Sequence, residues 1–372
     1  MTGSLDIRIF AHSWVSDWNH GNAHFLRGLA RSLGEMGHRV RCYEQWGSWS
    51  LTNLVQNEGE RAIDSIDQFR AMYPTLDVRF YQPGPDFAQY VAEELKGADV
   101  VIIHEWNDPQ VANAILSLKQ KLGFYALFHD THHRAYTSAR EILRFQLHLF
   151  DGVLAFGEAI RRIYADGFGV PHAWTLHEAA DVNIFYPRVA ERDIDLVWIG
   201  NWGDEERTRE LEEFLIGPSS AIKPRRTLVY GVRYPETALE RLKEAGIEFC
   251  GYLPNLRAPE VYGRTAMTLH VPRRQYTNGL SGIPTIRVFE AMACGAPLLC
   301  SPWIDTEGLF RPGDDYLTVA DGESMTAEIQ HLLRDDKARQ QLAQSGLATV
   351  RNRHTCKHRA EQLVEICEEL AR

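Results

Sequence analysis

The chain has 372 residues, of which 44% are hydrophobic and 24% charged, and its formal net charge is −10. This length exceeds one typical core and fits two domains of roughly 150–190 residues each. The acidic balance argues against binding of nucleic acid or of an anionic membrane through a global basic surface.

Further features narrow the class of protein. No run of 18 consecutive apolar residues occurs, so we expect no transmembrane segment. The N-terminus has no basic start followed by an apolar core, which predicts that no signal peptide is present. The six cysteines are scattered without a CxxC pair, a pattern typical of a reducing cytoplasm and not of a disulfide frame or a zinc site. A cytoplasmic protein is the expectation, and its oligomeric state stays open.

In the first half of the chain, short apolar runs alternate with helical patterns. Several runs are β-branched or aromatic throughout, which is typical of parallel strands covered on both faces. Segment 23–38 keeps its apolar residues on one helical face and reaches a stop at Gly37, so an amphipathic helix is predicted. The expected strands are 7–12, 39–44, 77–82, 99–105, 124–130 and 152–157.

A second alternating series follows a joint near residues 184–194. Helices are predicted over 209–216, 235–246 and 285–295, and the part from 323 to 372 should be helical with a break near 351–355. Alternating strands and helices predict an α/β protein with two Rossmann-like halves, each a doubly wound sheet. The expected strands are 195–200, 226–231, 248–253, 267–272, 297–302 and 316–319.

Two such halves facing one another would make a cleft, and ligands of open α/β sheets bind beyond the carboxyl ends of the strands. The most informative segment is SGIPTIRVFEAMACGAPLLCSPW, residues 281–303. Thr285 is placed to cap a helix whose free N–H groups suit phosphate. Glu290 lies about 7–8 Å further along the axis by helical rise. Its carboxylate can accept hydrogen bonds from ribose hydroxyls, and an ion pair with Arg287 or plain solvation is an equally weighted alternative.

The run G-x-P-x-x-R-V-F-E-A-M-A-C-G-A-P-L-L, with LFRPGDDYLTV after it, resembles the donor-binding half of GT-B glycosyltransferases. It is most similar to the glycosyl transferases group 1 family and its CgeB-type branch. Residues 151–187 resemble the end of that family's N-terminal domain. The resemblance implies an acceptor-side domain over 1–187, a donor domain over 188–352, and a C-terminal helix over 353–372 that crosses back to the first domain.

The resemblance also implies an activity. It indicates a hexosyltransferase-like enzyme that moves a sugar from a nucleoside diphosphate sugar, with retention of anomeric configuration, and that needs neither a metal nor a cofactor. The base, the sugar and the acceptor stay open.

Some donor-site residues follow position by position from the resemblance. Glu290 matches the family's ribose-binding acid, and Thr285 and Arg287 on the same helix are expected with it among the donor-binding residues. Gly282 stands where the family often carries a second acid near the donor sugar, which is a departure. Asn201 stands at the usual arginine position, and Arg207 can serve for the usual lysine. Arg273, or its neighbour Arg274, would supply another cation for the diphosphate, unless these arginines are only surface residues.

In the first half, Gly21 and Asn22 match the family's glycine turn near the donor. His129, at a predicted strand end, matches a histidine that contacts the donor sugar. The nearby Asp130, His132 and His133 also suggest a metal site, but no second ligand cluster accompanies them, and a metal-free enzyme is expected. His104–Glu105 ends another strand and is either a contact to acceptor, with Glu105 as a base, or a hydrogen-bonded loop.

Two alternatives remain on the same architecture. One is a nucleotide-sugar epimerase, because several acids have no assigned role. The other is a non-catalytic nucleotide-sugar binding protein, favoured by Gly282 and Asn201 at positions that are usually charged. A dehydrogenase is disfavoured because no GxGxxG follows the first strands.

Overall fold

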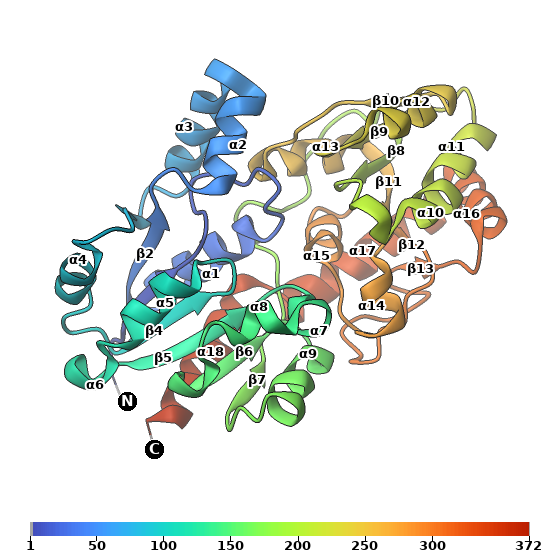
Figure 1. Ribbon diagram of the computed structural model, residues 1–372. Coiled ribbons are helices and arrows are strands. Elements are labelled where there is room, and N and C mark those ends of the chain that lie inside the picture. Colours follow the sequence, from blue (N-terminus) through green and yellow to red (C-terminus); the bar gives the residue numbers. More distant parts are fainter. Residues whose placement is uncertain (1–2, 372) are drawn as a thin grey trace. The chain divides into compact units, whose positions relative to one another are not determined.

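The computed structural model describes residues 3–371, apart from the side chain of Asp204 (Figure 1). The chain forms two compact units, each built on one parallel sheet. The first unit runs to Glu178 and resumes at Cys356, and the second comprises Ala179–Thr355. The boundaries expected from the sequence lie at 187/188 and 352/353.

The sheet of the first unit has the strand order β3-β2-β1-β4-β5-β6-β7, and all neighbouring strands are parallel. All six predicted strands are confirmed, and β7 is an addition, too short at three residues to show a pattern. The chain moves outward from β1 to β3 and then returns to the other side of β1 as β4. The bounds are β1 (Asp6–Phe10), β2 (Arg39–Gln45), β3 (Asp77–Tyr81), β4 (Val100–His104), β5 (Tyr125–Asp130), β6 (Gly152–Ala155) and β7 (Ala173–Thr175).

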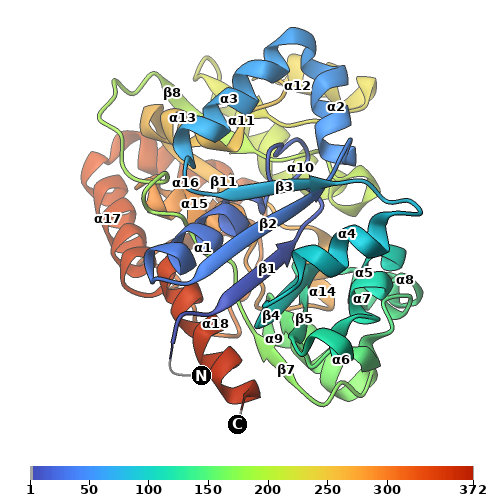
Figure 2. The ribbon, with the colours of Figure 1, turned by 90° about the vertical axis from the view of Figure 1, so that its left-hand side faces the viewer.

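Helices cover this sheet. The predicted amphipathic helix is α1, which buries Phe25, Leu26, Leu29 and Leu33, and Gly37 after it has a φ of +92°. The last helix, α18, packs along α1 (Figure 2). The bounds are α1 (Ala23–Glu35), α2 (Trp49–Glu58), α3 (Ala62–Met72), α4 (Phe87–Glu94), α5 (Pro109–Leu116), α6 (Lys119–Leu122), α7 (Arg134–Thr137), α8 (Ala139–Leu143), α9 (Glu158–Arg162) and α18 (Cys356–Leu370).

The sheet of the second unit has the order β10-β9-β8-β11-β12-β13 and is again parallel. All six predicted strands of this half are confirmed. The chain moves outward from β8 to β10 and returns beside β8 as β11. The bounds are β8 (Ile194–Ile199), β9 (Thr227–Tyr230), β10 (Ile247–Phe249), β11 (Thr265–His270), β12 (Leu298–Cys300) and β13 (Leu317–Thr318).

The predicted helices of this half are also present. The one expected over 209–216 consists of α10 and a wider helical turn, Glu212–Ile216. The predicted break near 351–355 falls between α17 and α18, where the chain leaves the second unit. The bounds are α10 (Thr208–Leu211), α11 (Gly217–Ala221), α12 (Glu236–Glu244), α13 (Ala258–Arg264), α14 (Arg274–Asn278), α15 (Ile286–Ala293), α16 (Gly322–Arg334) and α17 (Asp336–Arg353).

Each sheet has one switch point. There, two neighbouring strands are followed by connections that run to opposite sides of the sheet. In the first unit it lies between β1 and β4, and in the second between β8 and β11. Ligands of open parallel sheets bind beyond the strand ends at such points. Within the described residues, no helix is both long and apolar enough to cross a bilayer.

Candidate functional site

At the switch point of the second unit, the side chain of Arg207 joins the ends of β8 and β11. Its Nη2 and Nε donate to the carbonyl oxygens of Asn201 (2.5 Å) and Trp202 (3.4 Å), which follow β8. Its Nη1 donates to the carbonyl of Val271 (3.1 Å), which follows β11. The guanidinium also lies 5.1 Å from the ring centre of Trp198. Arg207 is therefore fixed in place by the backbone and is not a loose surface residue.

The charge of Arg207 is poorly solvated. Burial, together with the nearby charge of Arg273, lowers the pKa of Arg207 to about 9. The guanidinium of Arg207 stays protonated at neutral pH. A bound anion would compensate for the water that the guanidinium has lost on burial. Three of its five N–H groups donate to these carbonyls, and the part of the chain that the structure describes offers no acceptor to the other two.

His270, which was not singled out from the sequence, ends β11 beside Arg207. It is 3% exposed, and its ring meets that of Trp303 edge to face at 5.5 Å. Burial, and then the charge of Arg207, lower the pKa of His270 to about 3, so the ring is neutral. The sequence did contain one sign of His270, because a polar residue near the end of a predicted buried strand is unusual.

Asn201, at the position where the family carries arginine, fastens two strand ends together. Its Oδ1 accepts a hydrogen bond from the N–H of Val232 (2.9 Å), which follows β9. Tyr234 donates to the carbonyl of Gly200 at 2.8 Å on the same side. The amide thus shapes the loop that Arg207 holds, and it adds no charge.

Arg273 and Arg274 lie at the start of α14, after β11. Arg273 forms an ion pair with Glu206, whose other oxygen accepts from the side chain of Gln275 at 3.1 Å. Arg274 pairs with Glu210 at 3.0 Å and also donates to a backbone carbonyl. Both cations therefore carry a carboxylate partner, whereas the hydrogen bonds of Arg207 within the described residues go to backbone carbonyls.

Helix α15 carries the residues of the motif. Thr285 is the N-cap residue, but its side chain makes no capping hydrogen bond, and no acid stands in the first turn. Glu290 is fully buried and forms an ion pair with Arg287, which is 22% exposed. The ion pair with Arg287 is one of the alternatives that the sequence left open for Glu290. The other alternative, a solvated Glu290, is wrong. The charge of Arg287 acts on Arg207, so helix and switch point are close.

Gly282 precedes α15 in a conformation that few other residues adopt, with φ +92°. A Cβ at this position would lie 2.1 Å from Oγ1 of Thr306 and 3.3 Å from Cγ of Glu307. The space in which the family's second acid would start is thus taken by the loop that follows β12. The departure from the family pattern has a physical cause in the packing of this loop.

In the first unit, the predicted residues Gly21, Asn22 and His129 come together. Asn22 is the N-cap residue of α1, and its amide nitrogen lies 3.5 Å from the carbonyl oxygen of Thr131, just past β5. Phe25, in the first turn of α1, lies 6.2 Å from the ring of His129. His129 is 1% exposed, and burial lowers its pKa to about 4. It is a neutral imidazole at pH 7.

The acids near His129 form an internal network. Glu105 accepts from the N–H of Thr131 (3.1 Å) and from Arg134 (2.9 Å), and Asp130 accepts from the hydroxyl of Tyr164 (2.6 Å). Burial raises the pKa of Glu105 well above its ordinary value, and the adjacent Asp130 adds to the shift. Across residues 3–371, no three His, Cys, Asp or Glu side chains are arranged to hold one metal ion.

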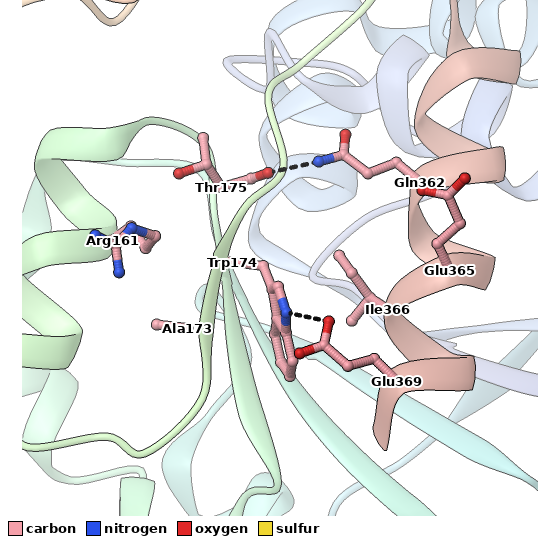
Figure 3. A pocket seen from close by; sticks show the side chains of 8 residues that line it. All are labelled: Arg161, Ala173, Trp174, Thr175, Gln362, Glu365, Ile366 and Glu369. Carbon is pink, nitrogen blue, oxygen red and sulfur yellow. Dashed lines mark hydrogen bonds between the residues drawn. The ribbon is translucent and has the colours of Figure 1, made fainter. Parts of the chain in front are cut away.

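A hollow of about 400 Å³ lies in the first unit between β7 and α18 (Figure 3). Trp174 stands in it and donates from its indole to Glu369 at 3.1 Å. Glu365 lies beside them. Arg161, which is paired with Glu158, also lines the hollow, and none of the predicted site residues does.

Two family comparisons cover most of the chain. Residues 207–365 match the family described as "Glycosyl transferase-like", and residues 20–182 match "Glycosyltransferase Family 4". No curated protein matches the sequence significantly. The CgeB-type branch stays a prediction.

Solved structures resemble the chain over almost its whole length. Anabaena HepE in complex with UDP and glucose is 13% identical, with 98% of this chain and 99% of that chain covered and a TM-score of 0.69. Sucrose-phosphate synthase from Thermosynechococcus elongatus is 15% identical, with coverages of 98% and 99% and a TM-score of 0.66. A protein from Rickettsia africae is 11% identical, with coverages of 100% and 99% and a TM-score of 0.68. At these identities the likeness shows the fold, which is the GT-B fold predicted from the sequence.

Proposed function

We propose that this chain, a glycosyltransferase with the GT-B fold, transfers a sugar from a nucleoside diphosphate sugar with retention of configuration. The observation that carries the donor class is Arg207 at the switch point between β8 and β11. It is a partly buried cation, and among the described residues two of its N–H groups have no hydrogen-bond acceptor. A diphosphate supplies the opposite charge and accepts those hydrogen bonds.

Arg207 would act on the departing diphosphate. Negative charge grows on this leaving group as its bond to the sugar breaks, and a fixed cation in a poorly solvated place stabilises that charge strongly. The N–H groups at the start of α15 add a partial positive charge, since the first turn holds no acid. Arg273 contributes less, because Glu206 neutralises part of its charge.

Glu290 would hold the ribose of the nucleotide. It is buried on α15, a helix whose Arg287 acts on Arg207, so one short helix can serve both ribose and phosphate. Uridine diphosphate is the first nucleotide to test, since the HepE structure holds UDP.

The test compares UDP with its 2′- and 3′-deoxy analogues by calorimetry. The wild-type protein should prefer UDP by about tenfold or more, the effect of a charged hydrogen bond of roughly 1.5–3 kcal/mol. Glu290→Gln should abolish the preference. If Glu290→Gln lowers thermal stability while the preference persists, Glu290 is only the structural partner of Arg287, and the ribose assignment fails.

His129 would serve the reaction as a neutral hydrogen-bonding group, in keeping with its burial and its lowered pKa. His129→Ala should therefore lower turnover by more than tenfold while UDP affinity changes less than twofold. Full turnover in the variant would refute the role. The proposed enzyme needs no metal, so activity should persist in EDTA, and strict metal dependence would overturn that part.

A non-catalytic nucleotide-sugar binding protein is the second candidate, and Gly282 is the observation that favours it. The acid expected from the family cannot be accommodated there without moving Thr306. Donor hydrolysis measured together with binding separates the two functions. Binding of a nucleotide sugar with neither hydrolysis nor transfer would favour the binding protein.

A further inference from the structure

Four imidazole rings meet at the switch point of the first unit. His12 follows β1, His20 precedes α1, His104 ends β4, and His129, paired with it, is the last residue but one of β5. The ring centres of His12 and His20 are 3.8 Å apart, those of His12 and His104 5.8 Å, and those of His104 and His129 5.3 Å. The four rings, here called the histidine cluster, come from four separate segments that only the sheet brings together.

Several ring nitrogens of this cluster have unused hydrogen-bonding capacity. His20 is 5% exposed, and within residues 3–371 no hydrogen-bond partner faces either of its nitrogens, Nδ1 of His12 or Nε2 of His129. His104 differs, because its Nε2 bonds to the hydroxyl of Thr131 at 2.9 Å. Buried polar atoms without partners are costly. They indicate a place that a polar ligand completes.

The start of helix α1 adds a positive partial charge to this place. The helix is 13 residues long, its N-cap side chain makes no capping bond, and its first turn holds no acid. The contacts of Asn22 with Thr131 and of Phe25 with His129 bring this helix end to the cluster. The N–H of Ala23 already donates to the carbonyl of His20 at 3.2 Å, so it is the dipole of the helix that favours an anion here.

The groups around the histidine cluster also favour an anion. Burial lowers the pKa of His12 to about 3, and Arg134 adds to the shift. Burial also lowers the pKa of His20, with His12, His104 and Arg27 as the further causes. The groups that act on these rings are thus bases or cations.

The neighbouring carboxylates already have partners. Asp17 pairs with Arg27 at 3.0 Å, and Glu105 pairs with Arg134 at 2.9 Å. Asp130 accepts from Tyr164. An arriving anion would therefore meet neutral rings that can gain protons, and it would meet no unpaired carboxylate among these acids.

We propose that His12, His20 and the start of α1 form an acceptor subsite for an anionic group, a phosphate monoester or a carboxylate. The identification of the bound molecule as the sugar acceptor rests on the proposed transferase function. The subsite itself does not. Neutral hydroxyls would use the ring nitrogens but would gain nothing from the helix end or from the surrounding cations.

The first experiment measures binding of inorganic phosphate by calorimetry to the full chain saturated with UDP, so that Arg207 is occupied. His20→Gln and His12→Gln should each weaken phosphate binding by at least tenfold and leave UDP binding unchanged. His148→Gln, at an exposed histidine of the same unit, is the matched control and should change neither. If UDP does not bind, the donor assignment fails by itself, and the phosphate titration is then made on the Arg207→Gln protein.

The second experiment uses the unaltered protein and so does not depend on how the variants fold. Sulfate, which stays a dianion near neutral pH, is titrated in buffers of different ionisation enthalpy. Because an anion favours the imidazolium form, binding should take up about one proton, and the ring carbon signals of one or two histidines should shift accordingly in NMR spectra.

Three results would overturn the subsite: no binding of phosphate or acetate, phosphate binding that both substitutions leave unchanged, or sulfate binding without proton uptake. A parallel titration with acetate separates the two chemistries. Tighter acetate binding identifies a carboxylate, and tighter phosphate binding identifies a phosphate monoester. Glucose binding that the two substitutions abolish, without any anion binding, would replace the proposal with a neutral sugar site.

Discussion

The switch points of the two units use different side chains for the same position in a parallel sheet. In the second unit, Arg207 lies across the ends of β8 and β11 and stays charged at neutral pH even though burial lowers its pKa to about 9. In the first unit, the ends of β1, β4 and β5 carry imidazoles, and burial lowers the pKa of His129 to about 4.

The difference teaches how a cation can be kept where solvation is poor. Arginine has so high an intrinsic pKa that burial and a like charge leave it protonated, and backbone carbonyls replace part of its water. Histidine loses its proton under the same burial. The second unit therefore carries a permanent charge at its switch point, whereas on our proposal the first would gain a charge only when an anion binds.

The sharpest way to break this comparison is to remove the permanent charge. Arg207→Gln should weaken UDP binding by at least about a hundredfold, because two charged hydrogen bonds of roughly 1.5–3 kcal/mol each are lost. Calorimetry at pH 7 measures this effect. Arg209→Gln, at an exposed arginine of α10, is the matched control and should change UDP affinity less than twofold. Equal effects of the two substitutions would mean that general charge, not the fixed position, attracts the nucleotide.

A smaller effect is expected from filling the space at Gly282. Gly313 has a similar φ, +88°, but no atom lies within 4 Å of an added Cβ. Gly313→Ala should cost about 1–2 kcal/mol from backbone strain alone. Gly282→Ala should cost a further 1–3 kcal/mol, roughly, because the Cβ overlaps the side chain of Thr306. Denaturant unfolding gives both values.

Thr306→Ala provides the control for the Gly282 experiment. It removes the hydroxyl that a Cβ at Gly282 would meet at 2.1 Å. The additional cost of Gly282→Ala should largely disappear in this background. If Gly282→Ala and Gly313→Ala cost the same with Thr306 in place, the loop after β12 yields easily, and packing is not the reason for the glycine.

The smallest and most gradual effect concerns pH. A histidine has a pKa of about 6.5 when unfolded, and burial lowers the pKa of His129 to about 4 in the folded chain. Between these values the unfolded chain binds more protons, so stability rises with pH. The stabilisation is present above pH 6.5 and is lost as the pH falls towards 4.

Hydrogen exchange at pH 7.5, 6 and 5 can assign this loss to the units. The first unit has four histidine rings at its switch point, of which those of His20, His104 and His129 are buried. It should therefore lose protection at a higher pH than the second unit, where, among the described residues, only His270 lies at the corresponding edge of the sheet. Equal loss in both units would contradict the contrast between them. In that case, groups outside the histidine cluster would dominate the pH dependence.

Much of the architecture could be read from the chain, because apolar runs and helical patterns are local signals. All twelve predicted strands formed, and the break before α18 fell where it was expected. Strand β7, which was not predicted, is only three residues long, and all three residues are half-buried. This strand forms because it pairs with β6, and pairing with a distant segment leaves no pattern in the local sequence.

The candidate site was less accessible to this reasoning. The motif around Glu290 was found because helix, cap and acid are neighbours in sequence. The partners of Arg207 were not found, because Asn201 and Val271 follow different strands and offer only backbone carbonyls. The histidine cluster escaped for the same reason, since His12, His20 and His104 lie in separate segments.

By itself, therefore, the amino-acid sequence determined the two α/β halves, the strand ends that carry polar residues and the helix that bears Glu290. These follow from hydrophobic periodicity and from capping, which act over a few residues. Only the tertiary structure decided which strand ends are neighbours, that Arg207 stays charged on backbone carbonyls, and that Gly282 has no room for a side chain. Strand order, burial and electrostatics arise from contacts between distant segments, and these exist only once the sheets have formed.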